Sequence, residues 1–151
     1  MDKKYTAAMI VIGNEILSGR TQDKNINYVA CKMVERGIAL SEVRVIPDVE
    51  DVIVNTILEM KEKVDYVFTS GGIGPTHDDI TAACVAKVFG VAIEENKGAY
   101  GLLLDHYGKE DLTAARLRMA NMPAGASLIP NPVSAAPGFS IENVYVMAGV
   151  P

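Results

Sequence analysis

A near-continuous apolar run at residues 6–12 constrains the fold of this chain more than any other feature of its sequence. The run reads TAAMIVI, so side chains on both faces of a strand there would be small or apolar. A strand with that pattern buries both faces, as in the centre of a parallel sheet. Because extended apolar runs alternate with helical periodicity along the chain, the sequence predicts an α/β layer fold with a mostly parallel sheet.

The same patterns predict where the other elements lie. We expect strands at 40–46, 66–70, 91–93, 126–129, 139–141 and 144–147, the last two joined by a tight hairpin at Glu142 and Asn143. We expect helices at 26–34, 49–60, 81–89, 96–107 and 112–119, with caps at Asp23, Asp48 and Asp111 and a capping box completed by Asp51.

Composition excludes several classes of protein. With 151 residues and 49% hydrophobic side chains, the chain is long and apolar enough for one globular domain spanning 1–151. Its net charge of -5 and scattered basic residues argue against a nucleic-acid surface, and the sequence predicts neither a membrane span nor a signal peptide. We therefore expect a cytoplasmic protein in which Cys31 and Cys84, each in an apolar helical pattern, are buried reduced thiols.

A glycine-rich run at 71–81, GGIGPTHDDIT, lies where the strand at 66–70 passes into the next helix. Its glycines allow φ above zero and a close approach to a ligand, and amides beside a helix N-terminus bind phosphate or another anion. The neighbouring Asp78 and Asp79 are candidates to bind a metal or position a water. The alternative is a tight connection in which one of these aspartates caps the helix. The run matches neither the P-loop nor the dinucleotide pattern.

Ligands of open parallel sheets bind outside the carboxyl ends of the strands. Four segments follow such ends, namely 13–15, 47–48, 71–79 and 148–151, and the proline-rich segment 131–138 is placed to form a wall beside them. The resulting pocket would contain the carboxylates of Glu15, Asp48, Asp78 and Asp79. An anionic ligand there needs backbone amides, Arg20 or Lys24, or a divalent metal to balance this charge.

Several motifs occur in one order along the chain: GNEILSG at 13–19, DKN at 23–25, IPD at 46–48, TSGGIGP at 69–75 followed by DIT at 79–81, and GVP at 149–151. This set resembles the molybdopterin-binding MoaB/Mog family over essentially all 151 residues. Within that family it is most similar to the CinA-like branch, the amino-terminal domain of competence-damage-inducible protein A and its free-standing relatives.

The resemblance implies a three-layer α/β/α fold assembled as a homo-oligomer, commonly a trimer. It implies molybdopterin as the ligand and a link to molybdenum cofactor biosynthesis, in which relatives attach AMP from ATP with Mg²⁺. By position, it assigns catalytic roles to Asp48 and Asp79. The ligand site that we expect from the strand ends and the resemblance together comprises Gly13, Asn14, Glu15, Ser70, Gly71, Gly72, Gly74, Pro75, Thr76, Asp78, Ser134, Gly138 and Gly149.

The chain departs from the adenylyltransferase pattern and shares the choices of the CinA-like branch. After the first strand it has Gly13-Asn14-Glu15 where those enzymes tend to have Ser-Asp. It also has Ile73 in place of a threonine, and His77 and Asp78 before Asp79. CinA-like relatives are associated with cleavage of the ADP-ribose pyrophosphate by a divalent metal such as Mg²⁺, Mn²⁺ or Co²⁺, with Asp78 and Asp79 as candidate ligands here. Because CinA-like sequences continue beyond the GVP motif, we expect either a truncated chain or a minimal domain.

Overall fold

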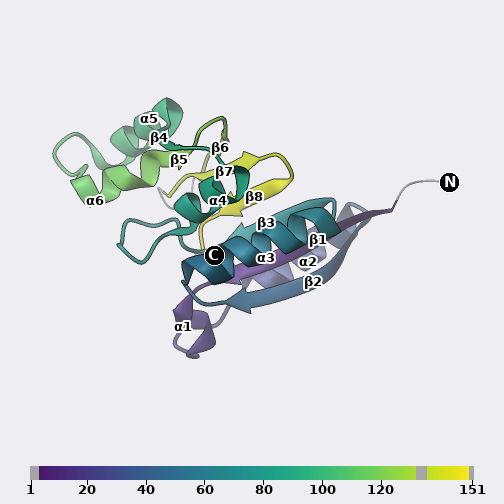
Figure 1. Ribbon diagram of the computed structural model, residues 1–151. Helices are drawn as coiled ribbons and strands as arrows, with labels where there is room; N and C mark the ends of the chain where they lie inside the picture. The colour runs from purple at the N-terminus through teal and green to yellow at the C-terminus, as the bar shows by residue number, and fades with distance from the viewer. Residues whose placement is uncertain (1–3, 132–135, 150–151) are drawn as a thin grey trace.

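The computed structural model describes residues 4–131 and 136–149. Its main feature is a six-stranded sheet (Figure 1). In order across the sheet the strands are β2 (Ile38–Ile46), β1 (Tyr5–Ile12), β3 (Tyr66–Ser70), β8 (Val144–Met147), β7 (Gly138–Ile141) and β6 (Ser127–Ile129). The pairings from β2 through β8 are parallel, and the pairings of β8 with β7 and of β7 with β6 are antiparallel. This arrangement confirms the expected α/β fold with a mostly parallel sheet.

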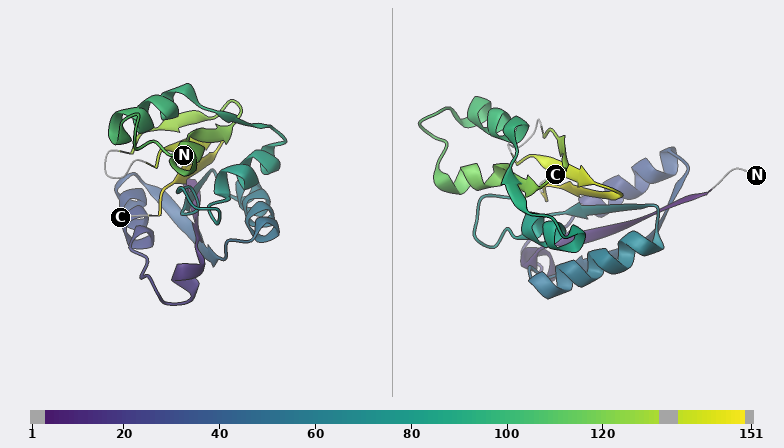
Figure 2. Two further views of the ribbon diagram at one scale, coloured as in Figure 1. Left: turned by 90° about the vertical axis from the view of Figure 1, so that its left-hand side faces the viewer. Right: turned by 45° about the horizontal axis from the view of Figure 1, so that its top comes forward.

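Helices cover both faces of the sheet, as Figure 2 shows. One face packs against α3 (Glu50–Lys63) and α4 (Thr81–Phe89), and the other packs against α2 (Asn25–Glu35). Alternate residues of β1 divide between these two layers: Ile10 and Ile12 face α3, while Met9 faces α2. The apolar run at 6–12 is therefore buried on both sides because helices lie on both sides.

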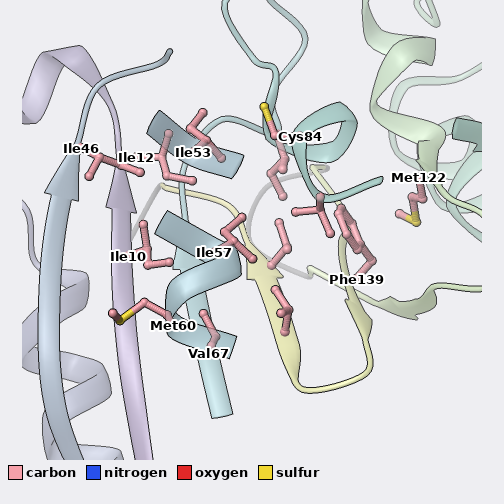
Figure 3. Close-up of a cluster of buried hydrophobic side chains, with 14 of the residues drawn as sticks. Ile10, Ile12, Ile46, Ile53, Ile57, Met60, Val67, Cys84, Met122 and Phe139 are labelled. Carbon is pink, nitrogen blue, oxygen red and sulfur yellow. The ribbon is translucent and has the colours of Figure 1, made fainter. Parts of the chain in front are cut away.

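The larger core lies between the sheet and the α3 and α4 layer (Figure 3). Ile53 and Ile57 of α3 are fully buried there, and Phe139 of β7 fills the end of the core nearer the antiparallel strands. Truncating a side chain of this kind typically destabilises a protein by about 2–5 kcal/mol. This core fixes the strands whose ends form the candidate site.

A second, two-stranded sheet corrects two of the predicted elements. It pairs β4 (Ile93–Glu95) with β5 (Asn121–Pro123) and lies beside α5 (Lys97–Tyr107), α6 (Ala114–Leu117) and a 3₁₀ turn, η1 (Arg118–Ala120). The predicted strand at 91–93 is displaced because the Val91 amide still donates to Ala86 at the end of α4. The predicted helix at 112–119 is shorter because Thr113, and not Asp111, accepts the capping hydrogen bond.

Other local predictions agree with the structure. The Ile26 amide donates to Asp23 Oδ2 at 2.8 Å, so Asp23 does bond to the first turn of α2, although the N-cap position itself is Lys24, one residue later than predicted. The hairpin between β7 and β8 is present, with Glu142 at φ 50°.

The prediction that both cysteines are buried is wrong for one of them. Cys84 is buried, and its burial raises the pKa of its thiol to about 11. Cys31 is exposed because it lies on the outer face of α2, and both thiols are free. Within the described residues, no helix has the length and apolarity needed to cross a membrane.

Candidate functional site

The four parallel strands end at one edge of the sheet. Ile12 is in register with Ile46, and Ser70 is in register with Met147. The amide just beyond each pair closes the edge: Gly13 donates to Ile46 at 3.0 Å, and Gly71 donates to Met147 at 3.1 Å. This edge, which we call the carboxyl edge, brings together the segments that follow β1, β2, β3 and β8, as the sequence predicts.

Two hydrogen bonds connect Asn14 and Asp48 across the carboxyl edge. The Asn14 amide donates to Asp48 Oδ2 at 3.1 Å, and the Asp48 amide donates to Asn14 Oδ1 at 3.3 Å. No side chain caps α3, so the predicted capping role of Asp48 is wrong. The nearby start of the short helix α1 (Asn14–Leu17) provides a partner for this carboxylate that only the tertiary structure supplies.

Like charges surround Asp48. Burial raises the pKa of the Asp48 carboxyl, the amide of Asn14 lowers it, and the carboxylates of Glu15, Asp79 and Asp78 raise it further. Glu15 folds back over Gly13, where an added Cβ would lie 2.5 Å from Glu15 Oε1. The four acidic residues predicted from the sequence are therefore close enough to interact electrostatically.

The glycine-rich loop depends on residues without a Cβ. Gly71 and Gly72 have φ of 95° and 77°, and a Cβ on Gly71 would collide with the carbonyl oxygen of Ile12. Within the described residues, the amides of Gly72, Ile73 and Gly74 donate no hydrogen bond. Three consecutive amides without a protein acceptor, beside the start of α4, are candidate donors to an anion.

Asp79 braces the loop. Its Oδ2 accepts from the Thr76 amide at 2.9 Å and from Thr76 Oγ1 at 2.7 Å. The residue that precedes α4 is Ile80, and no side chain caps this helix, so neither Asp78 nor Asp79 is an N-cap. Asp78 is exposed, and its Oδ1 lies 3.3 Å from Nε2 of the exposed His77.

The side chains of the described residues do not by themselves form a metal site. In residues 4–131 and 136–149, no three His, Cys, Asp or Glu side chains lie close enough together to hold an ion. The predicted ligands Asp78 and Asp79 point to different neighbours, namely His77 and Thr76. They fit only the mode usual for Mg²⁺, in which one or two carboxylates share the ion with phosphates of the substrate.

Arg118 is a cation at the loop that sequence reasoning did not predict. It comes from η1, and its Nη2 donates to the carbonyl of Pro75 at 3.1 Å. With Asp79 and Gly74 it also lines a small hollow beside the loop. Nothing in the sequence near Arg118 points to the loop, because the contact spans 43 residues and depends on how η1 packs.

A cavity of about 610 Å³ lies on the α2 side of the carboxyl edge. Its described lining comes from α2, the ends of β3 and β8, and the β6–β7 connection: Lys24, Asn25, Tyr28, Val29, Ser70, Ile129, Asn131, Ala136, Gly138, Met147 and Ala148. Of the predicted ligand residues, Ser70 and Gly138 lie in it. None of the four carboxylates lies in it. The single acidic pocket expected from the sequence is therefore two adjoining regions, the cavity beside α2 and the acidic region around the glycine-rich loop.

The two regions meet at Gly149. Its carbonyl accepts from Asn25 Nδ2 at 3.1 Å, and a Cβ on Gly149 would lie 3.1 Å from the Cα of Gly71. Asn131 and Ala136 line the cavity, as expected for a wall formed by this part of the chain. The predicted ligand residue Ser134 lies outside the described residues.

Comparison with known proteins places these features in a family. The model of a family described as a probable molybdopterin binding domain matches residues 8–151. A protein of Pyrobaculum calidifontis is 38% identical over 97% of this chain, and one of Archaeoglobus fulgidus is 36% identical over 95% of it. The chain spans 58% and 61% of the lengths of these two relatives.

Solved structures agree with the fold. CinA from Thermoplasma acidophilum, a protein described as having unknown function, superposes with a TM-score of 0.91 and 35% identity, covering 98% of this chain and 90% of that one. The tungsten cofactor synthesizing protein MoaB from Pyrococcus furiosus superposes with a TM-score of 0.60 and 16% identity, covering 99% and 85%. At that identity the second similarity concerns the fold alone.

Proposed function

Because this chain belongs to the molybdopterin-binding domain family related to the MoaB and Mog proteins, we propose that its carboxyl edge binds the phosphate of a pterin or nucleotide. The observation that supports this proposal most is the set of free amides at Gly72, Ile73 and Gly74. They lie at the end of a parallel strand and before a helix, which is where open α/β sheets bind ligands. The same proposal links the chain to molybdenum cofactor biosynthesis.

Different groups around the loop would make different contributions to binding an anion. The amides donate hydrogen bonds to phosphate oxygens, and the N-terminus of α4 adds a favourable dipole. Arg118, held at Pro75, supplies positive charge beside the loop. This charge is needed because the carboxylates of Glu15, Asp48, Asp78 and Asp79 repel a phosphate.

Calorimetry with molybdopterin tests the proposal. We expect wild-type protein to bind it at one site per chain and Arg118→Ala to bind about tenfold more weakly, since hydrogen bonds to charged groups contribute about 1.5–3 kcal/mol. Arg36→Ala is the matched control, because Arg36 is exposed beyond the other end of α2, before β2 begins. The absence of heat with molybdopterin, its adenylylated form, AMP and ADP-ribose would exclude the proposal.

A second candidate is a metal-dependent pyrophosphatase that acts on ADP-ribose. The negative charge that Glu15, Asp79 and Asp78 add near Asp48 supports this candidate, because a region of negative potential attracts a divalent cation. A bound Mg²⁺, Mn²⁺ or Co²⁺ would neutralise phosphate charge, with Asp79 and Asp78 as its proposed protein ligands. Adenylyl transfer to molybdopterin is a related outcome that requires the same groups.

Product analysis separates these activities. If the chain is a pyrophosphatase, ADP-ribose with one of these metals releases AMP, and Asp79→Asn abolishes the release while the protein stays folded. An unchanged rate in that variant excludes the proposed role of Asp79. Cytoplasmic residence and a trimer remain predictions, and so does any activity of the longer relatives, of which this chain matches only part.

A further inference from the structure

Building on the proposed function, we infer that the 610 Å³ cavity beside α2 binds a flat heteroaromatic ring, and that Ser70 recognises a polar atom on that ring. The phosphate of the same ligand lies at the glycine-rich loop. The ligand thus lies across two adjoining regions of the carboxyl edge. Residues of the cavity, and not the four acidic residues near the loop, then determine the specificity for the ring.

The size and chemistry of the cavity match this ligand class. Its volume lies within the 300–1,000 Å³ usual for small-molecule sites. Its walls include the aliphatic side chains of Val29, Ile129 and Met147, and the exposed ring of Tyr28 lies at its side. Apolar walls with few polar groups are typical of sites for planar rings, which bury two apolar faces and carry hydrogen-bonding atoms only on their edges.

Ser70 carries the strongest evidence for a ligand. It lines the cavity and is only 2% exposed, and its Oγ makes no hydrogen bond with the rest of the protein. A buried hydroxyl without a partner destabilises a folded protein, because it has lost its hydrogen bonds to water and gained none in exchange. A ring nitrogen or an exocyclic oxygen or amine would satisfy this hydroxyl, since a hydroxyl both donates and accepts.

The position of Ser70 also connects the cavity to the phosphate site. Gly71, the next residue, begins the glycine-rich loop, and Gly149 packs against it from the end of β8. Ala148, beside Gly149, lines the cavity. A ring in the cavity and a phosphate at the free amides are therefore neighbours, so one molecule can occupy both.

Two polar residues lie in the same lining. Lys24 is exposed at the start of α2, and Asn25 is half-buried and already donates to Gly149. The hydrogen bond from Asn25 Nδ2 to Gly149 connects α2 to the segment after β8 on the side of the cavity that faces the loop. The ammonium group of Lys24 is placed to favour a ligand with negative charge over a neutral one.

The experiment compares two probes that share a phosphate but differ in the ring. AMP carries a purine, and ribose 5-phosphate carries none. For wild-type protein we expect AMP to bind at least tenfold more tightly. Ser70→Ala should weaken AMP about five- to tenfold, as expected for one hydrogen bond, and leave ribose 5-phosphate unchanged. Tyr28→Ala should weaken AMP alone, and Val34→Ala is its control because Val34 is on the same helix, 77% exposed and outside the cavity lining.

Stability measurements separate recognition from folding. Ser70→Ala removes a hydroxyl that has no partner, so the variant should unfold at the same or a higher urea concentration than wild type. If Ser70→Ala and Tyr28→Ala both bind AMP like wild type while Arg118→Ala does not, the ring site is wrong and the proposed phosphate site stands. If wild type binds neither probe nor molybdopterin, the proposed function and the ring site both fail.

Discussion

Asp79 offers a direct test of how the glycine-rich loop keeps its shape. Its Oδ2 accepts two hydrogen bonds from Thr76, at 2.9 Å from the amide and 2.7 Å from the hydroxyl. Asp79→Ala removes both bonds and the charge. Asp79→Asn removes the charge and keeps an oxygen of the same size in place. Comparing the two variants therefore separates the effect of the hydrogen bonds on stability from the effect of the negative charge.

The expected size of the effect follows from the exposure of the pair. Hydrogen bonds to charged groups contribute about 1.5–3 kcal/mol each, but Thr76 is exposed and water competes for both donors. We therefore expect Asp79→Ala to lower the free energy of unfolding by about 1–2 kcal/mol. Asp79→Asn should lower it by about 0.5 kcal/mol, because the amide oxygen accepts the same bonds without charge and repulsion on Asp48 is relieved.

Urea denaturation measures these differences, with an unchanged m-value showing that only stability changed. Thr76→Ala completes a double-mutant cycle, and we expect a coupling energy of about 0.5–1 kcal/mol with Asp79→Ala. The reasoning is refuted if Asp79→Ala unfolds within about 0.3 kcal/mol of wild type. It is also refuted if Asp79→Asn is as unstable as Asp79→Ala, because the brace would then depend on charge alone.

Two further predictions concern the carboxyl edge. Because folding raises the pKa of Asp48, ionisation of this carboxyl opposes folding as the pH rises above its unfolded pKa of about 3.9. At pH 7 we therefore expect Asp48→Asn to be more stable than wild type by about 0.5 kcal/mol. Thermal melts at several pH values should show this gain in stability vanishing below about pH 4. Gly71→Ala should lose about 3 kcal/mol or more in urea denaturation, since its Cβ meets Ile12; Gly90→Ala, also at positive φ but in open space, should lose only about 1–2 kcal/mol, and equal losses would contradict the steric argument.

The carboxyl edge could be predicted from the sequence because its logic is local. An apolar run indicates each of these strands, and each run ends at a polar or glycine-rich segment. Once the strands are assumed parallel, their ends must meet at one edge. The free amides of the loop also follow from local composition, since Gly71 and Gly72 adopt φ that other residues rarely adopt.

The pairing of side chains at this edge could not be predicted in the same way. The local sequence pattern predicts that Asp48 caps a helix. In the structure its carboxylate instead accepts a hydrogen bond from the amide of Asn14, 34 residues away. Arg118 reaches Pro75 across 43 residues. Such contacts depend on how whole elements pack, and neither a periodicity nor a spacing motif records that.

The cavity was also beyond sequence reasoning, although Ser70 and Gly138 were predicted as ligand residues. Its existence depends on where α2 lies relative to β6, β7 and β8, and so on tertiary packing. The short strands β4 and β5 were missed or displaced for a related reason. With three residues each, they are defined by their pairing and carry too little sequence pattern to identify alone.

The position of β8 has a consequence for the order in which the protein matures. This strand is last in the chain among the strands of the sheet but lies inside it, paired with β3 on one side and β7 on the other. A ribosome therefore releases the glycine-rich loop long before the chain can place Met147 beside Ser70. The carboxyl edge is complete only when β8 docks between β3 and β7, because the Gly71 amide then donates to Met147; this pairing is distant in sequence and is therefore expected late in folding.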